Sequence, residues 1–217
     1  GTLTAEDVRY LNFTSGYTKF RWCRRGQTVA ECQTSRANGD HVADDDGKFR
    51  YSGGHMQKHA TLMGLGPDDN AALAHDISAA LGNIDITYSQ PQLAGGVVTN
   101  ATEYGRFLQR TVAGQTKIAS LLGSHPVCTN PRTCPSAIST PIPSDESWHY
   151  SVGHWVEDDP VVGDGAFSSP GAFGFYPWIS ADKRWWGIVA RHQTGGAIDS
   201  MRCGREIRAA WVSATAR

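Results

Sequence analysis

A spacing of three to four residues between apolar positions predicts three helices in the first half of the chain. One helix begins at a capping box, Thr4 to Asp7, another follows Pro67, and a third can begin at Asn100. A glycine follows each segment and predicts where the helix ends. The expected apolar faces consist of Val8 and Leu11, of Leu73, Ile77 and Leu81, and of Tyr104, Phe107, Leu108 and Val112.

An alternation with a period of two predicts strands in the last third of the chain. The alternating apolar residues of the first expected strand are Trp148, Tyr150, Val152 and Val156. Residues 172–179 and 185–192 are two further β-rich runs, and the polar residues between them predict a hairpin. A last helix is expected to carry Ile207 and Trp211.

This order of elements predicts an α+β fold with an antiparallel sheet, a C-terminal helix and a helical subdomain. Residues 1–147 are expected to form the helical and loop-rich part, and residues 148–217 the sheet and last helix of the same domain. Long loops are expected over residues 17–50 and over the proline-rich residues 123–147. A chain of 217 residues is long enough to bury a substantial core.

The composition excludes several classes of protein. A hydrophobic content of 40% with 19% charged residues indicates a globular chain rather than a disordered one. The net charge of −1 gives no sign of a nucleic-acid or anionic-membrane partner. No apolar run is long enough to span a bilayer. Because the first residue is Gly1 rather than Met, we expect that the chain was processed or trimmed and that any export signal has been removed.

Four of the five cysteines form two close pairs in loop-like sequence. Cys23 and Cys32 flank one short polar loop, and Cys128 and Cys134 flank another, whereas Cys203 is left over. The pairs predict two small disulfides and an oxidising compartment, so we expect a secreted or periplasmic protein. Spacing alone leaves free thiols open as an alternative. Structural zinc is disfavoured, because neither spacing is typical of a zinc site.

Two segments resemble active-site motifs of the serine β-lactamase-like hydrolases, which include class C β-lactamases, D-Ala-D-Ala peptidases and carboxylesterases. They are Phe49-Arg-Tyr-Ser-Gly-Gly54 and Ser168-Ser-Pro-Gly-Ala-Phe-Gly-Phe-Tyr-Pro-Trp178. Three more segments resemble the family in the expected order, at residues 3–16, 93–107 and 150–155. The resemblance implies a β-lactamase/transpeptidase-like fold and covers nearly the whole chain.

The family's first motif, Ser-x-x-Lys, carries the nucleophile and lies upstream of both segments. No such motif precedes Tyr51 in this sequence. The chain therefore resembles the C-terminal two-thirds of such an enzyme. We expect an N-terminal segment or a second chain to complete the fold and to supply the nucleophile.

The resemblance implies a catalytic role for Tyr51 and a substrate-binding place for Gly53. Tyr51 matches the family's general base or proton shuttle. A phenol has an ordinary pKa near 10, so this role requires a nearby cation that favours the phenolate. Gly53 stands where many members have Asn. This replacement disfavours binding of β-lactam or peptide substrates more than it disfavours hydrolysis itself.

The segment Ser169-Pro170-Gly171 occupies the place of the family's Lys-Thr-Gly or His-x-Gly motif and is expected to contact substrate. The following residue, Ala172, is expected to offer its N–H to the oxyanion. Because Ser169 replaces the basic residue, a substrate carboxylate would lose a charge-assisted hydrogen bond of about 1.5–3 kcal/mol. A neutral ester or amide therefore suits the site better than penicillin.

Other candidate sites are weaker. Ser180 and Lys183 satisfy Ser-x-x-Lys, but they lie in an expected hairpin, where no helical turn brings them together. His55 and His59 have the spacing of a helical metal pair but lack an evident third ligand, so no metal or other cofactor is expected. The predicted function is an ester or amide hydrolase that forms an acyl-enzyme. The alternative is a non-catalytic ligand-binding module, a degenerate hydrolase.

Overall fold

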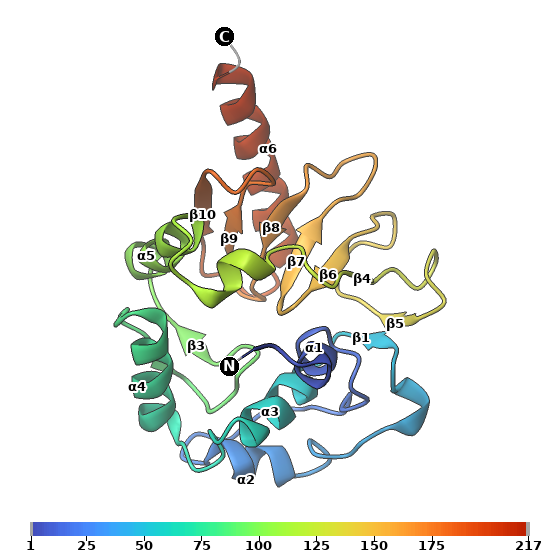
Figure 1. Ribbon diagram of the computed structural model, residues 1–217, viewed down its shortest axis with the longest axis vertical. Helices are drawn as coiled ribbons and strands as arrows, with labels where there is room; N and C mark the ends of the chain where they lie inside the picture. Colours follow the sequence, from blue (N-terminus) through green and yellow to red (C-terminus); the bar gives the residue numbers. More distant parts are fainter. Residues whose placement is uncertain (1, 216–217) are drawn as a thin grey trace.

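A computed structural model describes residues 2–215 of the chain. The main sheet packs against the C-terminal helix α6, helix α5 lies beside β10, and helices α1 to α4 gather at the opposite end of the molecule (Figure 1). The helices are α1 (Ala5–Leu11), α2 (Val29–Thr34), α3 (Gly53–Leu62), α4 (Asn70–Leu81), α5 (Ala101–Val112) and α6 (Ala197–Thr215), with 3₁₀ turns η1 (Ala43–Asp45) and η2 (Lys117–Leu121). The expected α+β fold is confirmed.

The predicted helices begin where local sequence signals place them, but α1 ends at Leu11 with Asn12 as its cap, well before the expected stop at Gly16. The Thr4 side chain accepts from Asp7 N–H at 3.1 Å, and Asp7 accepts from Thr4 N–H, so the expected capping box opens α1. Asp69 caps α4, and Gly82 ends it in the left-handed region with φ of 90°. Asn100 caps α5, as predicted.

The expectation of loop throughout residues 17–50 is wrong at α2. A second capping box, formed by Thr28 and Glu31, opens this short helix. Its inner residues Val29 and Cys32 are fully buried against α3, which explains why the segment is ordered as a helix. In α3, the hydroxyl of Ser52 accepts from Gly54 N–H at 3.4 Å.

The main sheet has six strands in the order β10-β9-β8-β7-β6-β4, with every neighbouring pair antiparallel. Two small sheets pair β1 with β5 in parallel and β2 with β3 antiparallel. The strands are β1 (Phe49–Arg50), β2 (Thr87–Tyr88), β3 (Val97–Val98), β4 (Val127–Cys128), β5 (Ala137–Ser139), β6 (His149–Ser151), β7 (His154–Glu157), β8 (Ala166–Ser168), β9 (Phe175–Ile179) and β10 (Trp186–Ala190). The expected loop over 123–147 therefore contains two short strands.

The single strand expected over residues 148–156 is a hairpin instead. Val152 and Gly153 have φ angles of 42° and 88°, which reverse the chain between β6 and β7. The helical part fixes this turn, because Val152 N–H donates to Asn12 Oδ1 at 2.5 Å and Gly153 N–H donates to Leu11 O at 3.0 Å. The predicted hairpin of β9 and β10 is confirmed.

Three apolar clusters hold these layers together. The largest is aromatic and joins the sheet to α6 and to the chain around β1; its fully or nearly fully buried members include Phe13, Phe49, Trp148, Trp155, Tyr176 and Met201. A second cluster lies among the helices, and a third lies between α5 and the sheet. The first cluster is the one that reaches the residues of the expected site.

A buried ion network also fastens α6 to the sheet. Arg208 on α6 is 1% exposed and donates to Glu157 Oε2 on β7 at 2.8 Å. It also contacts Asp164 and the hydroxyl of Tyr176, which itself donates to Glu157. Burying such charges is tolerated because each is paired and hydrogen-bonded.

One face of α6 is exposed apart from the contact of Trp211 with Trp185, and one edge of the main sheet pairs with no further strand within the described residues. Cys203, Ile207 and Trp211 recur every four residues along α6 and are all exposed, so they form one stripe, here called the α6 stripe. Strand β10 is the last strand at its end of the sheet. An apolar edge strand of this kind is a ready partner for another strand.

Candidate functional site

Tyr51 lies at the junction between β1 and α3, with its ring held by other aromatic rings. It stacks on Trp155 at a centroid distance of 5.5 Å and meets the edge of Phe13 at 5.1 Å. The residue remains 41% exposed. This packing fixes the ring while the side chain keeps access to solvent.

The surroundings of Tyr51 raise its pKa above the ordinary value of 10, because burial disfavours the charged phenolate. No lysine or arginine of the described chain offsets this effect. Tyr51 is therefore a protonated phenol at neutral pH. It can accept a proton only if a further cation is placed beside it.

Gly53 begins α3 next to the ring of Phe20. A Cβ atom at this position would lie 3.1 Å from Phe20 Cδ1 and 3.4 Å from Ala94 Cβ. An asparagine here would require Phe20 to move. The glycine therefore lets the segment before the first disulfide pack directly against the start of α3.

The segment from Ser169 to Gly171 forms the turn between β8 and β9. Ser169 N–H donates to Pro177 O at 3.2 Å, and Gly171 N–H donates to Phe175 O at 2.9 Å. A Cβ atom on Gly171 would lie 3.0 Å from that same Phe175 oxygen, so the close approach favours glycine. Ser169 is exposed and Pro170 is partly exposed.

Ala172 is exposed at the tip of this turn. Its carbonyl accepts from Gly195 N–H at 3.0 Å, and the next carbonyl, of Phe173, accepts from Gln193 N–H at 2.7 Å. Its own N–H donates to no acceptor within residues 2–215. The loop after β10 thus braces the turn and leaves this amide free for another acceptor.

The two predicted motifs share one neighbour, Trp155 of β7. Trp155, on which Tyr51 stacks, lies opposite Ser168 in the β7–β8 pairing. Ser168 directly precedes Ser169, and adjacent strands are about 4.8 Å apart. Trp155 is therefore the residue that connects Tyr51 to the start of the Ser169–Gly171 turn.

The local Ser-x-x-Lys does not form a nucleophile pair. Ser180 Oγ donates to Asp182 Oδ1 at 2.6 Å, whereas Lys183 Nζ donates to Leu122 O at 3.0 Å. Both residues lie in the β9–β10 connection rather than on a helix. The expectation that this motif is not catalytic agrees with the geometry.

The two histidines of α3 also make separate contacts. His59 Nε2 pairs with Asp7 Oδ1 at 2.8 Å, and His55 Nδ1 lies 2.8 Å from Ser15 Oγ. Among residues 2–215, no three His, Cys, Asp or Glu side chains are grouped to hold a metal ion. The Ser15–His55 contact was not foreseen from the sequence, since its members are 40 residues apart.

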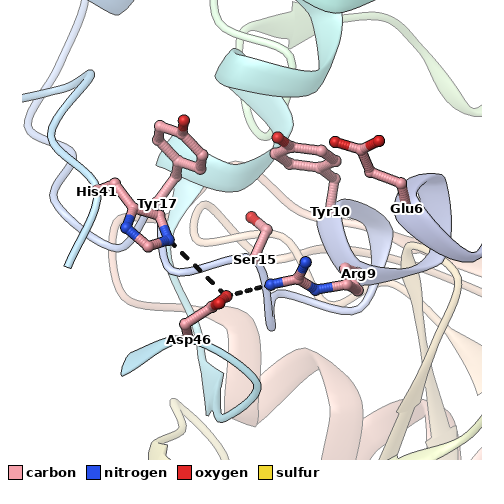
Figure 2. A pocket seen from close by; sticks show the side chains of 7 residues that line it. All are labelled: Glu6, Arg9, Tyr10, Ser15, Tyr17, His41 and Asp46. Carbon is pink, nitrogen blue, oxygen red and sulfur yellow. Dashed lines mark hydrogen bonds and ion pairs between the residues drawn. The ribbon is translucent and has the colours of Figure 1, made fainter. Parts of the chain in front are cut away.

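Ser15 lines a pocket at the C-terminal end of α1. The other residues that line it are Glu6, Arg9, Tyr10, Tyr17, His41 and Asp46 (Figure 2). Asp46 pairs with Arg9 and lies 3.8 Å from His41. This pocket contains none of the residues predicted for the site at Tyr51.

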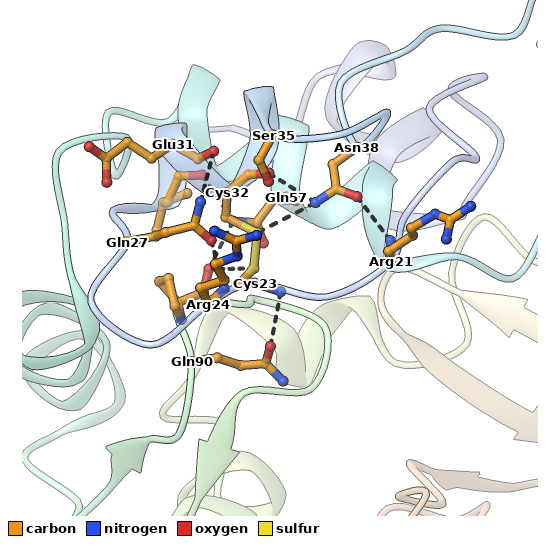
Figure 3. The surroundings of a disulfide bond; sticks show 12 residues. Arg21, Cys23, Arg24, Gln27, Glu31, Cys32, Ser35, Asn38, Gln57 and Gln90 are labelled. Carbon is orange, nitrogen blue, oxygen red and sulfur yellow. Dashed lines mark hydrogen bonds between the residues drawn. A yellow bond between two sulfur atoms is a disulfide. The ribbon is translucent and has the colours of Figure 1, made fainter.

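Both predicted disulfides, Cys23–Cys32 and Cys128–Cys134, are formed. The first one fastens the loop beside Gly53, and amide side chains support it (Figure 3). Asn38 donates to Cys32 O and accepts from Arg21 N–H, both at 2.9 Å, and Gln90 accepts from Cys23 N–H. The loop is therefore held at both ends. Disulfides of this kind fit an oxidising compartment.

Comparison with solved structures gives a match. A crystal structure described as a putative beta-lactamase from Bacteroides dorei DSM 17855 superposes with a TM-score of 0.59 at 22% sequence identity. The chain has a β-lactamase-like fold. The match covers 87% of this chain and 64% of the other, so the chain spans less than two thirds of that protein's length. No family model and no curated protein match the sequence.

This match supports the β-lactamase-like fold expected from the resemblance. Within this fold, strands β9 and β10 pack against α6. A likeness at this identity bears on fold alone. No helix within residues 2–215 is both long enough and apolar enough to cross a membrane.

Proposed function

We propose that the chain is the C-terminal portion of a secreted or periplasmic serine hydrolase of β-lactamase-like type. It acts on neutral esters or amides through an acyl-enzyme, and the nucleophilic serine belongs to an upstream segment or a second chain. Residues 1–147 and 148–217 are two parts of one domain, in which β4 of the first part pairs with β6 of the second.

One arrangement carries this proposal. Tyr51 stacks on Trp155, which lies opposite Ser168 at the start of the Ser169–Gly171 turn, and the free amide of Ala172 follows that turn. A proton-transfer group and an oxyanion donor are two of the parts that acyl transfer needs. The third part is a serine beside a base, and it is expected from the completing segment.

The state of Tyr51 supports a completing segment. Its pKa is raised rather than lowered, so the described residues do not activate it. A lysine brought in by the missing motif would favour the phenolate. The unpaired edge of β10 and the α6 stripe offer that segment a strand partner and an apolar face.

The neutral-substrate assignment rests on Ser169. A basic residue at this turn would attract a substrate carboxylate, whereas the Ser169 hydroxyl offers only an uncharged hydrogen bond. Gly53, packed against Phe20, presents no side-chain amide to the substrate. Both features favour an uncharged ester or amide.

The test is the variant Tyr51→Phe in the full-length protein. The phenyl ring keeps its stacking on Trp155, so the fold is retained while the hydroxyl is lost. We expect turnover of a p-nitrophenyl ester to fall by at least about 100-fold. Tyr88→Phe, at a buried tyrosine of β2, is the matched control and should leave turnover unchanged. Unchanged turnover in folded Tyr51→Phe protein would favour a ligand-binding module instead.

A further inference from the structure

Ser15 and His55 form a buried hydrogen-bonded pair outside the site proposed above. Ser15 Oγ lies 2.8 Å from His55 Nδ1, and His55 Nε2 lies 3.1 Å from Arg50 O. His55 is fully buried and Ser15 is 4% exposed. A serine hydroxyl at this distance from an imidazole nitrogen has the geometry of a nucleophile and its base.

The hydrogen bonds of the ring determine which nitrogen carries the proton. Arg50 O can only accept, so Nε2 is the protonated nitrogen of a neutral His55. Nδ1 is then an acceptor, and it also receives the Ser15 backbone N–H at 3.3 Å. The Ser15 hydroxyl therefore donates to Nδ1, which is the direction that proton abstraction requires.

The hydroxyl is accessible from a pocket with a volume of about 300 Å³. Figure 2 shows Ser15 directed toward the space between the rings of Tyr10 and Tyr17, with Glu6 and Arg9 at its border. The hydroxyls of Tyr10 and Tyr17 have no hydrogen-bond partner within the described residues. The wall thus combines two aromatic rings with free polar groups.

We propose that Ser15 and His55 are a second nucleophile–base pair, which takes short acyl groups from esters of small polar alcohols bound in this pocket. Aromatic faces together with hydroxyl, guanidinium and carboxylate groups suit a compact molecule that bears several hydroxyls. The pocket volume limits the ligand to a small alcohol with a short acyl chain.

The reaction exchanges one ester for another and then hydrolyses it. Ser15 Oγ bonds to the acyl carbon as its proton passes to His55 Nδ1. The bond to the alcohol oxygen then breaks, and the alcohol leaves with that proton. In the second half, water attacks the acyl carbon, Nδ1 takes the water's proton, and Ser15 Oγ leaves and recovers it.

The buried surroundings of His55 make this pair a slow one. Burial lowers the pKa of His55 to about 4, so the imidazole is neutral and ready to accept above about pH 5. The group that orients its Nε2–H is a backbone carbonyl instead of a carboxylate, which stabilises the imidazolium less. We therefore expect stoichiometric acylation with slow turnover.

The pair is separate from the site at Tyr51. The ring of Phe13 contacts both His55, at 5.4 Å, and Tyr51, at 5.1 Å, so it lies between them. Phe13 itself has a left-handed φ of 57°, and this conformation precedes the turn that carries Ser15. The inference stands on these residues alone and does not depend on the proposed function.

The test uses two separate samples of the 217-residue chain, one labelled with a fluorophosphonate and the other treated with p-nitrophenyl acetate. Trypsin cleaves after Arg9 and Lys19, so the expected label lies on peptide 10–19. We expect a burst of one p-nitrophenol per chain at most. The labelling rate should not change between pH 6 and pH 8, because His55 remains neutral throughout.

Variants separate catalysis from structure. Ser15→Ala should abolish the label on peptide 10–19. His55→Asn keeps an acceptor near Nδ1 but cannot take the proton, so labelling should slow by at least about 100-fold. Ser78→Ala, whose hydroxyl donates to Ile84 O, is the control and should label normally.

Equal labelling rates in folded His55→Asn protein and the parent would overturn the proposal. So would the absence of label on peptide 10–19 in folded parent protein. Label on an upstream serine of the full-length protein, with none on Ser15, would support the proposed function and reject this inference.

Discussion

At the scale of single residues, paired buried polar groups attach helix α6 to the sheet. Arg208, Glu157 and Tyr176 satisfy one another between α6 and the sheet. If one member were removed, its partner would remain buried as a charge without a counter-ion. Removing one member should therefore lower the free energy of unfolding by more than the intact network contributes to it.

We predict that Arg208→Met lowers the free energy of unfolding by about 3–5 kcal/mol, because the carboxylate of Glu157 stays buried with its main partner gone. Arg205 is 3.6 Å from Glu157 and compensates only in part. The double variant Arg208→Met/Glu157→Met should lose less than the single one. Urea unfolding of both variants measures this; losses that simply add would contradict it.

At the scale of elements, caps and turns differ in how well the sequence predicts them. The limits of α4 depend on Asp69 and Gly82, which are next to the helix, so local sequence predicts them. The turn between β6 and β7 depends on Asn12, about 140 residues away, and on a valine with positive φ. Gly153 is a local turn signal, but the contact with Asn12 that fixes the turn could not be predicted from it.

The same reasoning applies to the candidate sites. Tyr51 and the Ser169–Gly171 turn were predicted through a resemblance, because each motif is continuous in sequence. The Ser15–His55 pair was not predicted, because its partners meet only when α3 packs beside the turn after α1. Contacts between distant residues are visible only in the folded chain.

The pair Asp7–His59 joins α1 to α3 and predicts a pH dependence. Hydrogen bonds from His59 first, and then from Thr4, lower the pKa of Asp7 from 3.8 to about 2. A carboxyl with a depressed folded-state pKa contributes stability above about pH 4 and loses it as pH falls toward 2. The variant Asp7→Asn should therefore show a smaller loss of stability across that window.

Denaturant unfolding at pH 5, 4 and 3 measures the effect. Asp44→Asn, at an exposed carboxyl of η1, is the control and should keep the slope of the parent protein. Parallel curves for the parent and Asp7→Asn would show that the contact contributes nothing to the pH dependence.

At the scale of the whole molecule, the two disulfides and the remaining cysteine give a simple count. Cys23–Cys32 and Cys128–Cys134 are closed, and Cys203 is free and exposed. We predict one titratable thiol in denatured, unreduced protein and five after reduction. Five thiols without reduction would contradict both bridges and the oxidising compartment that they indicate.

That single thiol is also placed where an attached probe would report on the α6 stripe. Cys203 lies at the start of the α6 stripe, one helical turn before Ile207. A polarity-sensitive dye coupled there reports on one place only. Its emission would shift to the blue on any assembly that covers the stripe and stay unchanged on one that forms elsewhere, so the molecule carries its own reporter of contacts at this face.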